Sequence, residues 1–309
     1  MTTTDTQASA TGSARPARAP RPLANVRILS LALNLPGPAA LMRLRAMGAT
    51  CVKLEPPAPD GGAGDPMGVY APQAYAAMHE GVRVLQANLK TGPGQKALHR
   101  ELARTDVLLT SFRPSALAKL DIGWRKLHKL YPRLSQVAIV GALGERAEEP
   151  GHDLTYVAEH GLVTGLDLPA TLYADMGGSL AASEAVLQAQ LLRAAKGKGV
   201  FLEVALADAA GYLALPRAWG LTVPKGSVGG AHAGYRIYPC KDGRVAVAAL
   251  EPHFAKALCA AAGVDDASRK GMLAAGTHAA VAAFFATRTR KQLDKLGREQ
   301  DIPLHSLPR

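Results

Sequence analysis

The sequence predicts an α/β protein whose core is a doubly wound parallel sheet. Short apolar runs of strand length alternate with longer segments of helical periodicity over residues 26–206, and turns rich in glycine and proline separate them. With 309 residues, of which 48% are hydrophobic, the chain can bury a core in one large domain or two smaller ones. Aromatic residues make up only 5%, so we expect a core of Ala, Leu and Val.

The first predicted unit is a strand, a helix and a second strand. Residues 26–33 form an apolar run, "LPGP" follows as a turn, residues 39–47 have helical periodicity, and "TCVKLE" at 50–55 predicts the second strand. Together these segments have the length of a βαβ unit, in which the strands are parallel. Because the turn lacks the GxGxxG pattern of dinucleotide-binding folds, we predict neither NAD nor FAD.

Further strands and helices continue this pattern. The runs "DVLLTSF" at 106–112 and "LSQVAIVG" at 134–141 are short and apolar, as buried parallel strands are. Segments 91–104 and 116–132 are amphipathic with helical spacing. Strands joined by such helices form a doubly wound sheet with helices on both of its faces.

The part of the chain after residue 177 begins with a long helix. Residues 178–195 predict an alanine-rich helix closed by "KGKG", and "VFLEVAL" at 200–206 predicts a further strand. After the glycine-rich "KGSVGGAHAG", segment 235–263 contains a hairpin signal that turns at "KDG". We find no internal repeat in the sequence.

Targeting signals and cysteine usage indicate the expected compartment. Residues 1–21 are rich in Thr, Ala, Ser, Arg and Pro and lack an apolar stretch, so we expect a disordered tail and no secretory signal. No run of eighteen apolar residues occurs, which predicts that the chain does not span a membrane. Three cysteines without CxxC spacing argue against a disulfide framework and a zinc site. We therefore expect a cytoplasmic protein without a metal ion.

The net charge of +11 limits the class of ligand. Lys and Arg residues are scattered along the whole chain and do not form a dense block with interleaved aromatic residues, as a nucleic-acid groove would. We therefore expect no nucleic-acid partner. A dispersed positive field suits an anionic small molecule better.

The stretch "EEPGHDLTYVAEHG" has two interpretations. Asp153, after Pro-Gly-His, predicts an N-cap for a helix that begins at Leu154, and His152 alone is more often a structural residue. Asp175, before Met-Gly-Gly, is equally suited to cap the long helix that follows it. Capping and catalysis are compatible, because a helix N-terminus offers N–H groups and a positive dipole to a developing anion.

Five separated segments resemble one protein family. In order, they are "LANVRILSL…GPAALMRLRAMGATCVKLEPP", "RPSALAKLDIGW", "PGHDLTY", "YADMGGSLAASEAVLQAQLLRAAKGKG" and "YRIYPCKDGRVAVAALEP". Their order and spacing over residues 22–307 are similar to those of the family III CoA transferases, the group of L-carnitine CoA-transferase, formyl-CoA transferase and alpha-methylacyl-CoA racemase. The resemblance implies a Rossmann-like CoA-binding domain at 22–220, a smaller α+β domain at 221–309, an acyl-CoA substrate and an interlocked homodimer.

The resemblance also implies two alternative sets of catalytic residues. In the transferases an aspartate accepts the acyl group as a mixed anhydride that CoA thiolate attacks, and Asp153 stands at the matching position. In the racemase a histidine and a carboxylate move the α-proton, and these roles fall on His152 and Asp175. Glu251, in "ALEPHF", matches the glutamate that supports the histidine. Because His152 and Asp175 are both in place, we place α-proton transfer ahead of CoA transfer.

The same resemblance predicts the CoA-binding residues. No tightly bound cofactor is expected, because CoA is part of the substrate. Lys119, in "RPSALAKL", matches a basic position that meets the CoA phosphates, and Arg113 and Arg83 are weaker candidates. A solvated surface charge is the alternative for each of them, and for Arg83 it is the favoured interpretation.

The sequence also departs from the family pattern. Ser111 stands where Asn is common, Pro56 stands where an arginine helps to hold the nucleotide, and Leu35-Pro36 replaces a polar residue. Family members usually continue past the point that matches "DKLGREQDIPLHSLPR", so we expect the C-terminal return segment to be missing and the homodimer to dissociate more readily. A non-catalytic, degenerate paralogue is therefore a third alternative.

Overall fold

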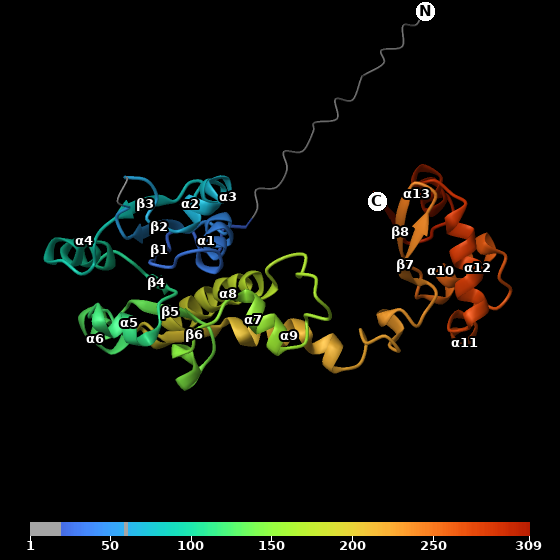
Figure 1. Cartoon of the computed structure of the whole chain (residues 1–309). Coiled ribbons are helices and arrows are strands. Elements are labelled where there is room, and N and C mark those ends of the chain that lie inside the picture. The colour runs from blue at the N-terminus through green and yellow to red at the C-terminus, as the bar shows by residue number, and fades with distance from the viewer. Residues whose placement is uncertain (1–19, 59–60) are drawn as a thin grey trace, which may run out of the picture. The chain divides into compact units, whose positions relative to one another are not determined.

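The computed structural model describes residues 20–58 and 61–309, so most of the predicted disordered tail lies outside the described part (Figure 1). The chain divides into two compact units, with the boundary between Gly211 and Tyr212. That boundary falls within helix α9 (Leu206–Ala218). The domain limit that we expected near residue 220 stays a prediction. Each unit is described by itself below.

A six-stranded parallel sheet forms the centre of the first unit. Its strand order is β3-β2-β1-β4-β5-β6, the order of a doubly wound sheet, which confirms the predicted fold class. The strands are β1 (Arg27–Ser30), β2 (Thr50–Glu55), β3 (Arg83–Gln86), β4 (Val107–Thr110), β5 (Ser135–Val140) and β6 (Phe201–Ala205). Strand β1 pairs with β2 on one side and with β4 on the other, so the winding direction reverses between β1 and β4.

Helices cover both faces of this sheet. The helical elements are α1 (Pro36–Ala46), α2 (Met67–Tyr70), α3 (Pro72–Met78), α4 (Gly92–Leu102), α5 (Pro114–Lys119), α6 (Trp124–Leu130), the 3-10 turn η1 (Gly144–Glu148), α7 (Asp153–Glu159) and α8 (Tyr173–Lys196), followed by α9. On one face α1 and α8 pack on the sheet, and on the other face α4, α5 and α6 do so.

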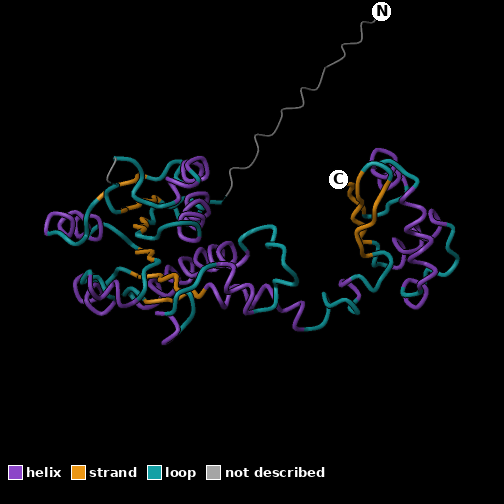
Figure 2. Tube along the Cα trace, in the orientation of Figure 1, coloured by secondary structure: helices purple, strands orange, loops and turns teal. Residues whose placement is uncertain are grey.

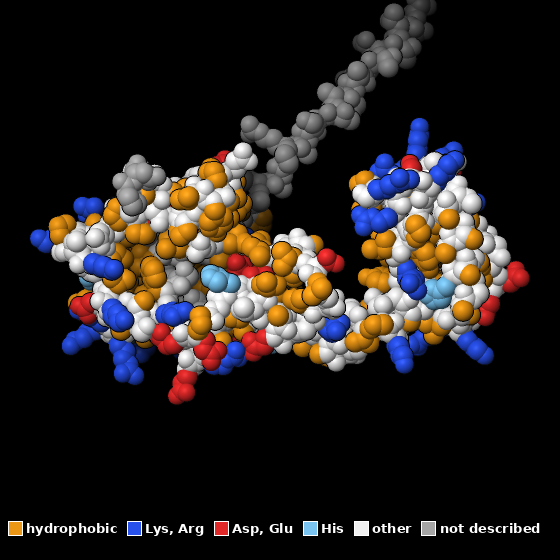
Figure 3. All heavy atoms as spheres, viewed as in Figure 1, with side chains coloured by type: hydrophobic (Ala, Val, Ile, Leu, Met, Phe, Trp, Pro, Cys, Tyr) orange, Lys and Arg blue, Asp and Glu red, His pale blue; other side chains and the backbone are white. Residues whose placement is uncertain are grey.

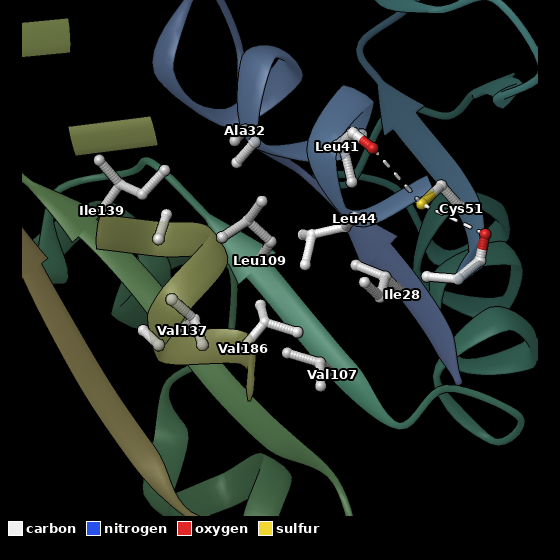
Figure 4. Packing of buried hydrophobic residues seen from close by; sticks show 14 of the residues in the cluster. Ile28, Ala32, Leu41, Leu44, Cys51, Val107, Leu109, Val137, Ile139 and Val186 are labelled. Carbon is white, nitrogen blue, oxygen red and sulfur yellow. Dashed lines mark hydrogen bonds between the residues drawn. The ribbon is translucent and has the colours of Figure 1, made fainter. Parts of the chain in front are cut away.

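Strand alternation explains this two-sided core. In β4, Val107 and Leu109 belong to the cluster under α1 and α8, whereas Leu108 belongs to the cluster on the opposite face. Figure 4 shows the first cluster, in which Leu44 of α1 and Val186 of α8 meet the strand residues. All these side chains are buried. A strand buried on both faces needs a continuous apolar run, which is why β4 and β5 could be predicted from sequence.

The structure differs from the sequence prediction at several elements, among them two helical segments and one strand. The single helix expected over residues 116–132 is two helices, because Asp121 adopts a left-handed conformation (φ 63°) and Ile122 turns into the core. Helix α8 begins at Tyr173, five residues before the predicted start. Strand β3 was not predicted, because it is a four-residue edge strand with only partly buried side chains.

The second unit has a small antiparallel sheet packed on helices (Figure 2). Its elements are the 3-10 turn η2 (Ser227–Gly229), β7 (Tyr235–Cys240), β8 (Gly243–Ala248), α10 (Pro252–Ala262), α11 (Arg269–Met272), α12 (Ala275–Ala286), α13 (Arg290–Glu299) and β9 (Leu304–Leu307). Cys240 pairs with Gly243, which confirms the predicted hairpin. The core of this unit joins Tyr238 and Val245 of the sheet to Phe285 of α12. A smaller α+β part therefore accompanies the sheet, as predicted.

Two further expectations concern the described part of the chain as a whole. Over residues 20–58 and 61–309, no helix is both long enough and apolar enough to cross a bilayer. Within the same ranges, no three His, Cys, Asp or Glu side chains gather in a way that could hold a metal ion.

Candidate active site

A cavity with about 170 Å³ of free volume opens at the carboxyl ends of the central strands. The loops after β1, β4, β5 and β6 contribute to it, together with the starts of α7 and α8. Its walls are formed by Leu33, Asn34, Pro36, Ser111, Phe112, Arg113, Ile139, Val140, Gly141, Ala147, Glu149, Gly151, His152, Tyr156, Asp175 and Leu206. Because β1 and β4 flank the point where the winding reverses, the cavity lies where doubly wound sheets bind their ligands.

The loop after β1 forms one wall and is held in place by two side chains. The Leu33 N–H donates to the Ser111 hydroxyl at 3.1 Å. The Asn34 N–H donates to both carboxylate oxygens of Asp65, at 3.0 and 3.1 Å. Asn34 adopts a left-handed conformation (φ 61°), which asparagine tolerates better than most residues. Ser111, a departure from the family pattern, thus has a structural partner here.

Behind this wall lies a buried ionic cluster that sequence reasoning missed. Lys53 of β2, with 0% of its side chain exposed, pairs with Asp65, also at 0%, and lies 3.5 Å from Glu55 at 1%. Tyr75 donates to the Glu55 carboxylate at 3.2 Å. The sequence indicated this cluster only through Lys53, a charged residue between the apolar Val52 and Leu54 of "TCVKLE". Its partner Asp65 lies twelve residues away, so the pairing could not be identified from local pattern.

His152 and Asp153 lie at the start of α7, but the N-cap of this helix is not the residue that we predicted. The helix begins at Asp153, and His152 is its N-cap residue. The His152 N–H donates to the Thr155 hydroxyl at 3.1 Å, and that hydroxyl donates to the His152 carbonyl at 2.8 Å. The prediction that Asp153 caps a helix beginning at Leu154 was therefore wrong.

Asp153 instead caps a different helix. Its Oδ1 accepts a hydrogen bond from the Asp175 N–H at 2.9 Å, and Asp175 is the third residue of α8. This N–H is one of those that a helix start leaves without an intrahelical partner, so Asp153 stabilises the α8 N-terminus from outside. Asp153 is only 5% exposed and is not among the residues that line the cavity.

The Asp175 carboxyl lies in the cavity wall with a perturbed pKa. Burial raises the pKa of Asp175 from its ordinary value of 3.8 to about 6, the negative charge of Asp153 adds to the rise, and His152 opposes it. A carboxyl group with this pKa can hold or release a proton close to neutral pH. His152, exposed and on the same cavity, is the second group with suitable proton chemistry.

The predicted CoA-binding residues lie in three different settings. Arg113 precedes α5, is exposed and lines the cavity. Lys119 ends the same helix and is exposed. Arg83 begins β3, at the opposite end of the strands, and its guanidinium lies 2.8 Å from the buried carboxylate of Glu101. The structure therefore places Arg113 with His152 at the cavity and does not bring Arg83 there.

The remaining predicted residue lies in the other unit. Glu251 is the exposed residue before α10, and its side chain does not cap that helix. Its support of His152 stays a prediction.

Over the face drawn in Figure 3, the blue Lys and Arg side chains form several separate groups rather than one continuous patch.

Residues 23–308 match the family model of CoA-transferase family III. The chain belongs to this family. This family member is 33% identical to succinyl-CoA–D-citramalate CoA-transferase of Chloroflexus aurantiacus over 64% of its own length and 52% of the relative. It is 28% identical to human alpha-methylacyl-CoA racemase over 75% of the chain and 62% of the racemase. The chain therefore spans between about half and two thirds of the length of these curated relatives.

A solved structure shows the same fold. The crystal structure of a hypothetical protein from Mycobacterium tuberculosis superposes with a TM-score of 0.79 at 23% sequence identity, and the match covers 92% of this chain and 83% of that one. The relatives include transferases and a racemase, so membership in the family is compatible with both reactions that the sequence suggested.

Proposed function

We propose that this chain catalyses α-proton transfer on an acyl-CoA thioester, with His152 and Asp175 as the acid–base pair. The observation that carries the proposal is the contrast between the three candidate groups. His152 and Asp175 line the cavity and the pKa of Asp175 is about 6, whereas Asp153 is 5% exposed and engaged in capping α8. A residue that must attack an acyl group needs access to it.

The reaction needs two groups on opposite faces of the α-carbon. The Asp175 carboxylate takes the α-proton, so that an O–H bond forms as the C–H bond breaks, and the electron pair passes onto the thioester oxygen as an enolate. Protonated His152 then gives its N–H proton to the other face of the carbon, and the enolate electrons form the new C–H bond. The reverse direction exchanges the two roles, and no net charge or redox change results.

We further propose that CoA, as part of the substrate, binds in the large domain expected over residues 22–220. Arg113 lies at the cavity and Lys119 lies one helix length away, at the end of α5. Exposed cationic side chains at the two ends of α5 suit the phosphates of a polyanionic ligand.

The state of the working protein is also a proposal: a cytoplasmic homodimer without nucleic-acid or membrane partners. Three large apolar side chains of the second unit are well exposed in the single chain: Tyr212 at 74%, Trp219 at 66% and Ile237 at 60%. Aromatic side chains such as those of Tyr212 and Trp219 are enriched in protein interfaces. Sedimentation at two protein concentrations, with and without acyl-CoA, tests the dimer.

CoA transfer through an Asp153 anhydride is the second candidate. Its support is that the C. aurantiacus relative, at 33% identity, is named as a CoA-transferase. In this reaction Asp153, only 5% exposed, would have to become accessible to the acyl carbon, while its Oδ1 accepts the Asp175 N–H. The third candidate is a paralogue that catalyses neither reaction.

One experiment separates these candidates. The chain is incubated with a panel of acyl-CoAs in deuterium oxide, with and without free carboxylic acids as acceptors. Deuterium at the α-carbon without acyl exchange is the expected result. Acyl exchange without deuterium would establish the transferase alternative, and neither signal would leave the non-catalytic paralogue.

A further inference from the structure

The Tyr156 hydroxyl occupies a gap between two glycines in the cavity wall. A Cβ atom at Gly141 would lie 2.3 Å from the Tyr156 hydroxyl oxygen, and one at Gly151 would lie 2.4 Å from it. No real side chain tolerates such contacts, so the phenol position requires glycine on both sides. Gly141 directly follows β5, and Gly151 precedes the His152 N-cap, so both walls belong to the proposed site.

This hydroxyl lacks a hydrogen-bond partner among the residues that the structure describes, although Tyr156 is only 7% exposed. Buried tyrosine hydroxyls usually have a partner. Tyr238, at 5% exposure, follows that rule, because its hydroxyl donates to the Ala233 carbonyl at 2.8 Å. Tyr156 therefore presents an unused donor to the cavity that His152 and Asp175 also line.

The donor stays protonated at physiological pH. Burial raises the pKa of the Tyr156 phenol above its ordinary value of 10, and the negative charge of Asp175 raises it further. A neutral phenol cannot act as a base here, but its O–H can donate to an oxygen on which negative charge develops.

We propose that the Tyr156 hydroxyl donates a hydrogen bond to the thioester carbonyl oxygen of the substrate. This inference rests on the proposed function, because the oxygen becomes negative when Asp175 removes the α-proton. The phenol proton stays on Tyr156 throughout, and the hydrogen bond strengthens as the enolate forms. Such a contact favours the transition state over the bound substrate, so it lowers the barrier more than it tightens binding.

The first test is Tyr156→Phe in the full chain. We expect the kcat for deuterium incorporation at the α-carbon to fall on the order of 100-fold, with KM changed less than about 3-fold. The acid limb of the pH profile near pH 6 should not move, because the proposed hydrogen bond goes to the substrate. If Tyr156 acted only by positioning Asp175, its loss would shift this limb. An unchanged kcat, or a shifted acid limb with a small loss of kcat, overturns the inference.

The matched control is Tyr238→Phe, which removes a buried hydroxyl that already has a partner. We expect it to lower the melting temperature and leave kcat unchanged, whereas Tyr156→Phe should leave the melting temperature nearly unchanged, since it removes no hydrogen bond within the described part of the chain. A fall in kcat that both variants share would reflect general destabilisation and would overturn the assignment.

A second readout needs no turnover. A CoA thioether that carries a nitronate mimics the enolate, and the matching saturated CoA thioether is the neutral reference. Tyr156→Phe should weaken the binding of the nitronate ligand about 10-fold and the binding of the neutral ligand less than about 2-fold. If wild-type protein shows no exchange, the proposed reaction fails, while this ratio still decides the role of Tyr156. If the ratio of the affinities for the nitronate and the neutral ligand is the same in wild type and variant, the proposed role of Tyr156 is overturned.

Discussion

Polar side chains on the two sides of the cavity differ in their hydrogen bonding. Behind Asn34, the Asp65 carboxylate accepts from Lys53 and from the N–H groups of Asn34 and Met67. On the other side, within the described part of the chain, the Asp175 carboxylate accepts no hydrogen bond and the Tyr156 hydroxyl donates none. Satisfied groups fix a wall, and unsatisfied groups with shifted pKa values are free to meet a substrate. The difference separates the scaffold of this site from its chemistry.

Removing the lysine of the satisfied side should have the largest effect on stability. Lys53→Met leaves Asp65 and Glu55 buried without their positive partner, which costs about 3–5 kcal/mol of unfolding free energy. Denaturant unfolding measures the loss. The control is Lys126→Met, which breaks the pair with Asp121, whose two side chains are 49% and 68% exposed, and should cost less than about 1 kcal/mol. Similar losses for both variants would contradict the scaffold role of the buried cluster.

On the side of the cavity where Asp175 and Tyr156 lie, His152→Ala should abolish activity and leave stability nearly unchanged. We expect a loss of about 100-fold or more in α-carbon exchange, because one of the two proton-transfer groups is gone. The fold should persist, since residue 152 contacts Thr155 through its main chain. His305→Ala, at an exposed position of the second unit, is the control. Full exchange activity in the His152→Ala chain would remove His152 from the site.

Asp175 should make the protein less stable at neutral pH. Its folded pKa of about 6 exceeds the unfolded value of 3.8, so ionisation costs the folded state free energy. That cost is absent below about pH 4 and complete above about pH 6. Asp175→Asn should therefore stabilise the chain by about 1 kcal/mol at pH 7 and by almost nothing at pH 4, after allowance for partial solvent access. Unfolding curves at the two pH values check this, and an equal difference at both would contradict the shifted pKa.

The smallest expected effect concerns substrate affinity. Lys119→Ala should raise KM for acyl-CoA about 3- to 10-fold with little change in kcat, because a phosphate contact is alike in ground and transition states. Added salt should weaken binding by the wild type more than by the variant. Lys129→Ala, on the exposed face of α6, serves as the control. Identical KM values for the Lys119 and Lys129 variants would place Lys119 outside the site.

The sequence predicted the parts of the fold that depend on local pattern. The continuous apolar runs of β4 and β5, the βαβ unit around α1 and the hairpin of the second unit are all present. The break at Asp121 was missed because a single left-handed residue interrupts an otherwise regular helical pattern. Edge strand β3 was missed because its side chains are only partly buried.

In the site, residue types were predictable but long-range partners were not. The family resemblance named His152 and Asp175 as candidates, and both line the cavity, whereas the capping of α8 by Asp153 joins residues twenty-two positions apart. The pairing of Lys53 with Asp65 depends in the same way on how the loop after β2 folds back. The open position of Tyr156 depends on two glycines from different segments, which no spacing rule connects.

The central claim is that α-proton transfer proceeds without Asp153 as a nucleophile, and Asp153→Asn tests it most directly. The amide oxygen can still accept the Asp175 N–H, so the start of α8 is kept while the attacking carboxylate is lost. The measurement is deuterium incorporation at the α-carbon of an acyl-CoA that wild-type protein turns over. We predict a rate within about 10-fold of the wild-type rate. The account would be contradicted if wild-type protein transferred the acyl group and the Asp153→Asn variant neither transferred it nor incorporated deuterium.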